Sequence, residues 1–166
     1  FVNDDHALLL KEDCSARFEH NTVVNSNIAV INFGEPERGY TPGRGASLDG
    51  NIFFGYPLVF QNVTLNPSLQ LTMNRTLVTA SEHFRGVGNI DADPLFVNSP
   101  TDLHLKPGSP AIGAGRNGLD LGAYVSGGAS ISGVPNGISD QTSVNLSVWG
   151  PGVTAYQYRV RDNGTW

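Results

Sequence analysis

Three stretches of the chain carry the same order of apolar and polar positions. The order is apolar, polar, apolar, two variable residues, Asn, one variable residue and two strand-forming residues, and it occurs without gaps at 16–24, 46–54 and 69–77. Period-2 alternation places every second residue of a strand on the same face. We therefore predict one coil repeated three times, with two apolar ladders stacked inside it: Ala16, Ala46 and Leu69 in one, and Phe18, Leu48 and Leu71 in the other.

A second strand follows the first in each coil. It is expected at 27–31 and 57–61, and 6–10 has the pattern of their predecessor. The connection between the first and second coils is longer than the next one, and the excess lies at 34–45, where Gly, Pro and Arg are frequent. A solenoid tolerates a loop at one corner because each coil contacts only its neighbours. We therefore predict a surface loop at 34–45.

The repeated Asn comes at the turn after the first strand of each coil. Asn21, Asn51 and Asn74 occupy this place. An Asn tolerates left-handed backbone angles, and its side-chain amide can bond to the Asn of the next coil. We predict a structural asparagine ladder, with exposed turn residues as the open alternative.

Composition favours the same all-β fold class. Only 15% of the residues are charged, and the 20 Gly and 10 Pro are typical of short strands separated by tight turns. The net charge of −5 is spread along the chain without a Lys/Arg cluster, so we expect no nucleic acid partner. The longest apolar runs, 7–10 and 28–31, are too short to cross a bilayer, so we expect no membrane insertion.

A second set of motifs follows the repeats. It consists of "DPLF" within 88–97, "LHLKPGSPAIGAG" within 102–115 and "DLGAY" at 120–124. Together with the coils, this order resembles the closing segment of bacterial right-handed parallel β-helix proteins, a group that includes pectate-lyase-like folds and large secreted or surface proteins. The resemblance covers about 5–125. It implies an all-β, right-handed parallel β-helix with a terminal cap, in a protein that is secreted or held at a bacterial cell surface.

The closing segment, residues 88–124, has the chemistry of a cap. Its prolines remove backbone donors and its glycines allow tight turns, so a further coil cannot be added. We expect five apolar residues of this segment to close the open hydrophobic end of the helix: Leu95, Phe96, Leu103, Leu105 and Ile112.

The chain is expected to change character after the cap. We predict the carboxyl-terminal part of a parallel β-helix with its cap at 1–125, a linker at 126–132 and an incomplete β-sandwich at 133–166. Alternation at 142–148 and 155–160 is similar to the opening strands of an immunoglobulin-like or fibronectin-like module, which needs about 100 residues. We expect both chain ends to be cut from a longer protein, and the unfinished strands to be covered by the cap or by self-association with a neighbouring copy.

No residue is predicted to be catalytic. The carboxylates of the first coil do not recur as a pair on the next coil, where Asp49 stands alone, and solvated surface is the favoured interpretation. Asp91 and Asp93 are weak calcium candidates, with a turn before Pro94 as the stronger interpretation. No other cofactor is expected. The single Cys14 is expected to be a small buried hydrophobe.

The inserted loop contains the best candidates for contact with a glycan. Tyr40 offers an aromatic face for a sugar ring, with Arg38 and Arg44 beside it on the same loop. Two functions stay open: a structural or adhesive segment of a large secreted or cell-surface bacterial protein, fibre-forming or glycan-contacting, or the non-catalytic end of an extracellular polysaccharide lyase or glycoside hydrolase whose active coils lie upstream. The fragment itself is expected to have no enzymatic activity.

Overall fold

The computed structural model describes residues 1–79, 86–124, 130–132 and 147–149. The chain divides into two compact units, Phe1–Val125 and Ser126–Trp166. The first unit contains the repeated coils and the closing segment, and the second contains one pair of short strands. No α-helix occurs in the described ranges. Each unit is described by itself.

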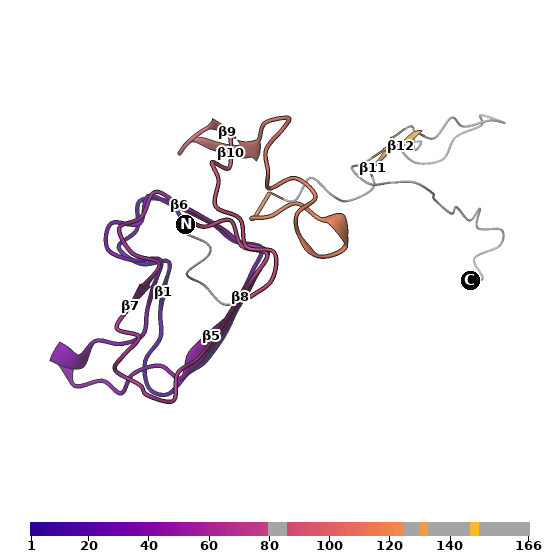
Figure 1. The fold of residues 1–166 in the computed structure, drawn as a ribbon. Coiled ribbons are helices and arrows are strands. Elements are labelled where there is room, and N and C mark those ends of the chain that lie inside the picture. Colours follow the sequence, from indigo (N-terminus) through magenta and orange to yellow (C-terminus); the bar gives the residue numbers. More distant parts are fainter. Residues whose placement is uncertain (80–85, 125–129, 133–146, 150–166) are drawn as a thin grey trace, which may run out of the picture. The chain divides into compact units, whose positions relative to one another are not determined.

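The coils of the first unit form a parallel β-helix, as the sequence predicts (Figure 1). The first two coils contribute one strand to each of three sheets, and the third coil contributes a strand to two of them. All strand pairs in these sheets are parallel. The first sheet holds β1 (Leu8–Leu9), β4 (Ile31–Asn32) and β7 (Phe60–Gln61), the second holds β2 (Ser15–Glu19), β5 (Gly45–Asp49) and β8 (Gln70–Asn74), and the third holds β3 (Thr22–Val24) and β6 (Ile52–Phe54).

The predicted register is confirmed between the first two coils. Ala16 pairs with Ala46 and Phe18 pairs with Leu48. The loop expected at 34–45 connects β4 to β5 and holds the short 3-10 helix η1 (Pro36–Arg38), although Gly45 already belongs to β5. The insertion thus leaves the stacking of its own coil intact.

The predicted register of the third coil is wrong by two residues. Ala46 pairs with Leu71 rather than Leu69, and Leu48 pairs with Met73 rather than Leu71. A shift of two residues keeps each side chain on the same face of a strand, so period-2 alternation fits both registers equally well. Met73 is buried beneath Leu48 and extends the inner ladder.

Two hydrophobic cores lie on opposite faces of the third sheet. The inner core fills the coils, and Val23 and Phe53 point into it. Val24 and Ile52, on the same strands, belong to a second core outside the coils. Both faces of β3 and β6 are therefore covered, which is why these strands are apolar at nearly every position.

The closing segment supplies the other side of the second core. Its hairpin of β9 (Phe96–Asn98) and β10 (Asp102–Leu105) is antiparallel, and Phe96, Leu103 and Leu121 pack in the second core with Leu77. At its end, Gly122 N donates to Gly50 O (2.7 Å). The cap therefore lies over the outer face of the third sheet, a position that the sequence analysis did not predict. Of the five apolar residues expected to cover the hydrophobic end, Phe96, Leu103 and Leu105 pack in this second core. Leu95 and Ile112 are each 39% exposed and close no core.

The second unit contains β11 (Ser130–Ser132) and β12 (Ser147–Trp149), which pair antiparallel. Three residues of the segment expected to be a linker thus form a strand. The strand expected at 142–148 overlaps β12 at 147 and 148, and the strand expected at 155–160 lies outside the described residues. The short antiparallel pair is consistent with the predicted partial β-sandwich class.

Candidate functional site

A repeated corner connects the second sheet to the third. Residues with left-handed backbone angles occupy it on successive levels: His20, Gly50, Arg75 and Gly88. The residue two positions after each of them begins the next strand or bridge, and these residues, Thr22, Ile52, Leu77 and Ile90, stack in parallel. The corner therefore has one ladder position per level: Asn21, Asn51, Thr76 and Asn89.

Asparagines in the ladder join neighbouring coils through both ends of the side-chain amide. Asn51 Oδ1 accepts from Asn21 N (2.9 Å), and Asn51 Nδ2 donates to Phe18 O (2.9 Å). Asn89 repeats this arrangement, since its Oδ1 accepts from Thr76 N (3.1 Å) and its Nδ2 donates to Met73 O (3.0 Å). Each such Asn satisfies two backbone groups of the preceding coil.

Asn74 is not a member of this ladder, which corrects the sequence alignment. It pairs with Asp49 at the end of β8, and its Oδ1 accepts from Val87 N (3.0 Å). The two-residue shift of the third coil places Thr76 in the ladder instead. The sequence does carry a signal for the missed member Asn89, because Gly88-Asn89-Ile90 repeats Gly50-Asn51-Ile52.

The second sheet presents a polar outer face to solvent. Its exposed row consists of Arg17, Ser47 and Thr72, which pair across the three strands. Beside this row a shallow pocket of about 250 Å³ opens at the beginning of the strands. The pocket is lined by Ser15, Ala16, Arg44, Gly45, Ala46, Ser47, Gln70 and Thr72.

Glycine is required at the centre of this pocket. A Cβ atom on Gly45 would lie 1.9 Å from Gln70 O, because the neighbouring strand approaches closely there. The same residue leaves the sheet surface open between Ser15 and Gln70, its neighbours on the adjoining strands. The absence of a side chain at Gly45 therefore explains both the close approach of the two strands and the open pocket.

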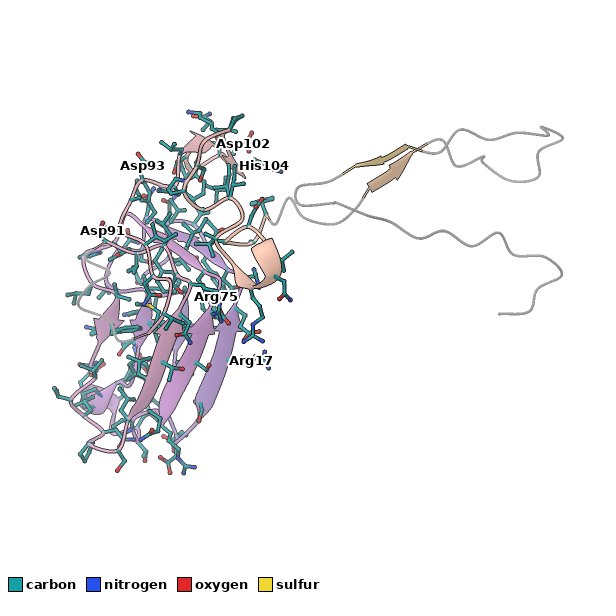
Figure 2. All side chains as sticks on the ribbon, turned by 45° about the vertical axis from the view of Figure 1, so that its right-hand side comes forward. Arg17, Arg75, Asp91, Asp93, Asp102 and His104 are labelled. Atoms are coloured by element: carbon teal, nitrogen blue, oxygen red, sulfur yellow. The ribbon has the colours of Figure 1, made fainter. Side chains whose placement is uncertain are left out.

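A charged cluster lies at the other end of the same face. Arg75 makes a bidentate ion pair with Asp49, with one hydrogen bond from Nε to Asp49 Oδ1 (2.8 Å) and a second from Nη2 to Asp49 Oδ2. Hydrogen bonding to Asp49 raises the pKa of Arg75. Arg17 Nε donates to Glu19 (2.6 Å). Arg116, the first residue of η3 (Arg116–Gly118) in the closing segment, approaches Asp49 to 3.8 Å. Figure 2 shows Arg17 and Arg75 near each other on this face.

The loop candidates for glycan contact are separated in the structure. Arg44 pairs with Asp13 (2.9 Å) and lines the pocket. Tyr40 and Arg38 do not line it. The Tyr40 ring is exposed and carries Lys11 Nζ 4.0 Å from its centroid, so one face of the ring is occupied by a cation.

Lys11 also fixes the base of that loop. Its Nζ donates to Glu35 Oε2 (2.9 Å), and Arg38 lies 3.7 Å from the other Glu35 oxygen. The hydrogen bond from Lys11 lowers the pKa of Glu35. Tyr40 and Arg38 are therefore part of the contacts that hold the loop against the preceding coil, and Arg44 is the candidate that faces the pocket.

The other candidate residues have structural partners. Asp93 Oδ1 accepts from Leu95 N (2.8 Å), which is the turn interaction that the sequence favours over calcium. Within the described ranges no three His, Cys, Asp or Glu residues are gathered for a metal ion. Glu12 Oε1 accepts from Thr41 N (3.2 Å). Cys14 is exposed, so the expectation that it is buried is wrong.

The closing segment carries one more polar group. His104 Nδ1 lies 2.7 Å from Asp102 Oδ1, and the hydrogen bond lowers the pKa of Asp102. The ring of Tyr124 lies 4.5 Å from that of His104, centroid to centroid. Figure 2 shows Asp102 and His104 at the hairpin, away from Arg17 and Arg75. Sequence reasoning did not single out this trio.

No helix in the described part of the chain is long and apolar enough to span a membrane. Comparison with known proteins finds no matching family model, curated protein or solved structure.

Proposed function

We propose that this chain is a structural and adhesive segment of a secreted or cell-surface bacterial protein, and that the outer face of β2, β5 and β8 binds a polysaccharide. The observation that carries the proposal is the pocket around Gly45, which has polar side chains in its lining. It is formed by three successive coils, so a solenoid scaffold presents it without any moving part.

The lining of the pocket suits a hydroxyl-rich ligand. Arg44 offers guanidinium donors, Gln70 offers both an amide donor and an acceptor, and Ser47 and Thr72 offer hydroxyl groups that donate and accept. The rest of the exposed lining surface is apolar and suits the C–H faces of a sugar ring. A mixture of convergent polar groups and short apolar patches favours recognition of a carbohydrate over that of a purely apolar ligand.

The same lining favours binding over cleavage. Glycoside hydrolysis generally uses two carboxyl groups on either side of the scissile bond, and none of the eight lining residues is an acid. Asp13, on the preceding coil, is paired with Arg44 of the lining. Arg44 is thereby held in place at the edge of the pocket, which reduces the entropy that it loses when a ligand binds.

A substitution that fills the pocket tests the proposal. Thr72→Trp places a large side chain on the exposed row of β8, where an aromatic residue is compatible with a strand. Thr64→Trp is the matched control, because Thr64 is an exposed threonine of the same coil that does not line the pocket. Both variants and the wild-type chain are screened against a set of neutral and acidic polysaccharides by retardation in affinity gels.

The expected result is that at least one polysaccharide retards the wild-type chain and Thr64→Trp, and that Thr72→Trp loses this retardation. Thermal unfolding of the three proteins should coincide to within a few degrees. If no polysaccharide is bound, or if the two tryptophan variants bind equally well, the proposed function is wrong.

A further inference from the structure

The charged cluster at the ends of β2, β5 and β8 has an excess of cations. Three guanidinium groups, those of Arg17, Arg75 and Arg116, meet only two carboxylates, those of Glu19 and Asp49. One positive charge therefore remains uncompensated within the cluster. Asp49 interacts with all three arginines, since it also raises the pKa of Arg17 after the larger effect of Glu19.

The three arginines differ in how much of their hydrogen-bonding capacity is used. Arg75 is fixed on Asp49 by two hydrogen bonds, and its side chain is only 20% exposed. Arg17 uses only its Nε, on Glu19, and is 76% exposed. Arg116 stands at 3.8 Å from Asp49, beyond hydrogen-bond distance, and is 69% exposed. Arg17 and Arg116 therefore keep guanidinium donors for a ligand.

Asp49 and Arg75 also position these donors. The pair is largely shielded from solvent and links the second coil to the third, while Arg116 brings the closing segment to the same carboxylate. Guanidinium groups recognise oxyanions through two parallel hydrogen bonds, and such bonds are stronger when both partners are charged. The cluster thus presents the exposed guanidinium groups of Arg17 and Arg116 beside the rigid Asp49–Arg75 ion pair.

The cluster is continuous with the pocket. Arg17 pairs with Ser47 in the exposed row, and Ser47 Oγ lies 3.4 Å from Thr72 Oγ1, so one row joins Arg17 to two lining residues. Gly45 and Asp49 are four residues apart on β5, which is about 13 Å in a strand. A polysaccharide lying along the strands is long enough to contact both ends of the face.

We propose that Arg17 and Arg116 bind an oxyanion substituent, a carboxylate or a sulfate, of an acidic polysaccharide whose sugar rings occupy the pocket. This inference rests on the proposed function and specifies the class of its ligand. Recognition by the two arginines adds charge-assisted hydrogen bonds to an oxyanion beyond the contacts that Arg44, Gln70 and Thr72 make with sugar hydroxyls. The ligand is selected by its substituents and not by its sugar backbone alone.

Three polymers with one backbone test the proposal: dextran, carboxymethyl dextran and dextran sulfate. Their affinities are measured by calorimetry at constant ionic strength for the wild-type chain, Arg17→Ala/Arg116→Ala, Thr72→Trp and Lys106→Ala. Lys106 is an exposed cation of the closing segment outside the cluster, so Lys106→Ala shows what the loss of a cation elsewhere on the surface does to binding. Comparison of the two charged polymers distinguishes a carboxylate from a sulfate.

The wild-type chain should bind at least one charged polymer roughly tenfold or more tightly than dextran, the range expected for a charge-assisted contact. Arg17→Ala/Arg116→Ala should lose this preference, and Lys106→Ala should keep it. The proposal is overturned if neither charged polymer binds, if charged and neutral polymers bind equally, or if Lys106→Ala weakens binding as much as the double variant.

The outcomes separate this inference from the proposed function. If Thr72→Trp abolishes binding of a polysaccharide while the double arginine variant changes nothing, the pocket is functional and the oxyanion site is wrong. If the arginine variant abolishes the preference for charge while Thr72→Trp changes no binding, the oxyanion site stands and the pocket is not its neighbouring subsite. Unchanged melting temperatures of the variants show that binding, and not folding, is affected.

Discussion

Asn51→Ala should destabilise the β-helix strongly, because this side chain is buried and joins two coils. Asn51 Oδ1 accepts from Asn21 N and Asn51 Nδ2 donates to Phe18 O, each at 2.9 Å. Asn51 has no exposed surface. An alanine at this position removes both hydrogen bonds, so Asn21 N and Phe18 O of the first coil lose their side-chain partner.

The size of the effect follows from these two groups. An unsatisfied buried donor or acceptor costs about 1–3 kcal/mol, so the loss of both predicts a decrease in unfolding free energy of about 2–6 kcal/mol. Asn74→Ala is the matched control. Its Oδ1 accepts from Val87 N, and Val87 is 65% exposed, so water can replace the lost acceptor at a cost of about 1 kcal/mol.

Equilibrium urea unfolding followed by circular dichroism measures the difference. The midpoint of Asn51→Ala should fall well below that of the wild type, with little change in the slope, and the midpoint of Asn74→Ala should fall only slightly. The gap-free alignment of the three repeats makes Asn51 and Asn74 equivalent, whereas the structure places only Asn51 in the ladder. Equal effects of the two variants would therefore contradict the structural assignment of the ladder.

Three further predictions test other parts of the fold. Gly45→Ala should cost more than about 3 kcal/mol because its Cβ meets Gln70 O, whereas Gly39→Ala, which has open space but a positive φ, should cost about 1 kcal/mol in thermal unfolding. Leu121→Ala should cost about 2–5 kcal/mol and Ile112→Ala less than about 1 kcal/mol, and the reverse order would refute the second core. Lys11→Ala should raise the pKa of Glu35 toward its ordinary value in an NMR titration. Because the folded-state pKa of Glu35 is depressed, its contribution to stability exists at neutral pH and is lost as the pH falls through that pKa, so wild type and variant should converge in acid.

The repeat and its inner core follow from local pattern. Alternation over 16–18 and 46–48 reports which residues face inward, and the stacking of these two strands follows the alignment. The third coil shows the limit of that reasoning. Both possible registers of its strand place the odd-numbered residues, such as Leu71 and Met73, on the buried face. Which of these two residues packs beneath Leu48 depends on the backbone pairing with the neighbouring strand, and the sequence of one strand does not encode that pairing.

The position of the cap was missed although the sequence contains a sign of it. Thr22-Val23-Val24 and Ile52-Phe53-Phe54 are apolar on both faces of their strands, and such runs are typical of strands that are covered on both sides. The inner core needs only Val23 and Phe53 from them. The remaining apolar residues require a second layer, which the closing segment provides.

The candidate site depends on residues from different coils. Arg44 was singled out from the loop, but its neighbours Ser15 and Gln70 belong to the coils before and after it, and only stacking brings them together. The cluster of Asp49, Arg75 and Arg116 combines two coils with the closing segment in the same way. Without the register of the third coil, neither the pocket nor the cluster can be derived from the sequence.

Hydrogen exchange with and without a bound polysaccharide tests the central proposal most directly. Mass spectrometry of the wild-type chain, saturated with its tightest-binding polysaccharide, should show slower exchange at 15–19, 44–49 and 70–75, the strands of the outer face and their ends. Exchange on the hairpin at 96–105 and on the loop at 35–41 should not change. Protection confined to that hairpin or loop, with none on the three strands, would contradict the account.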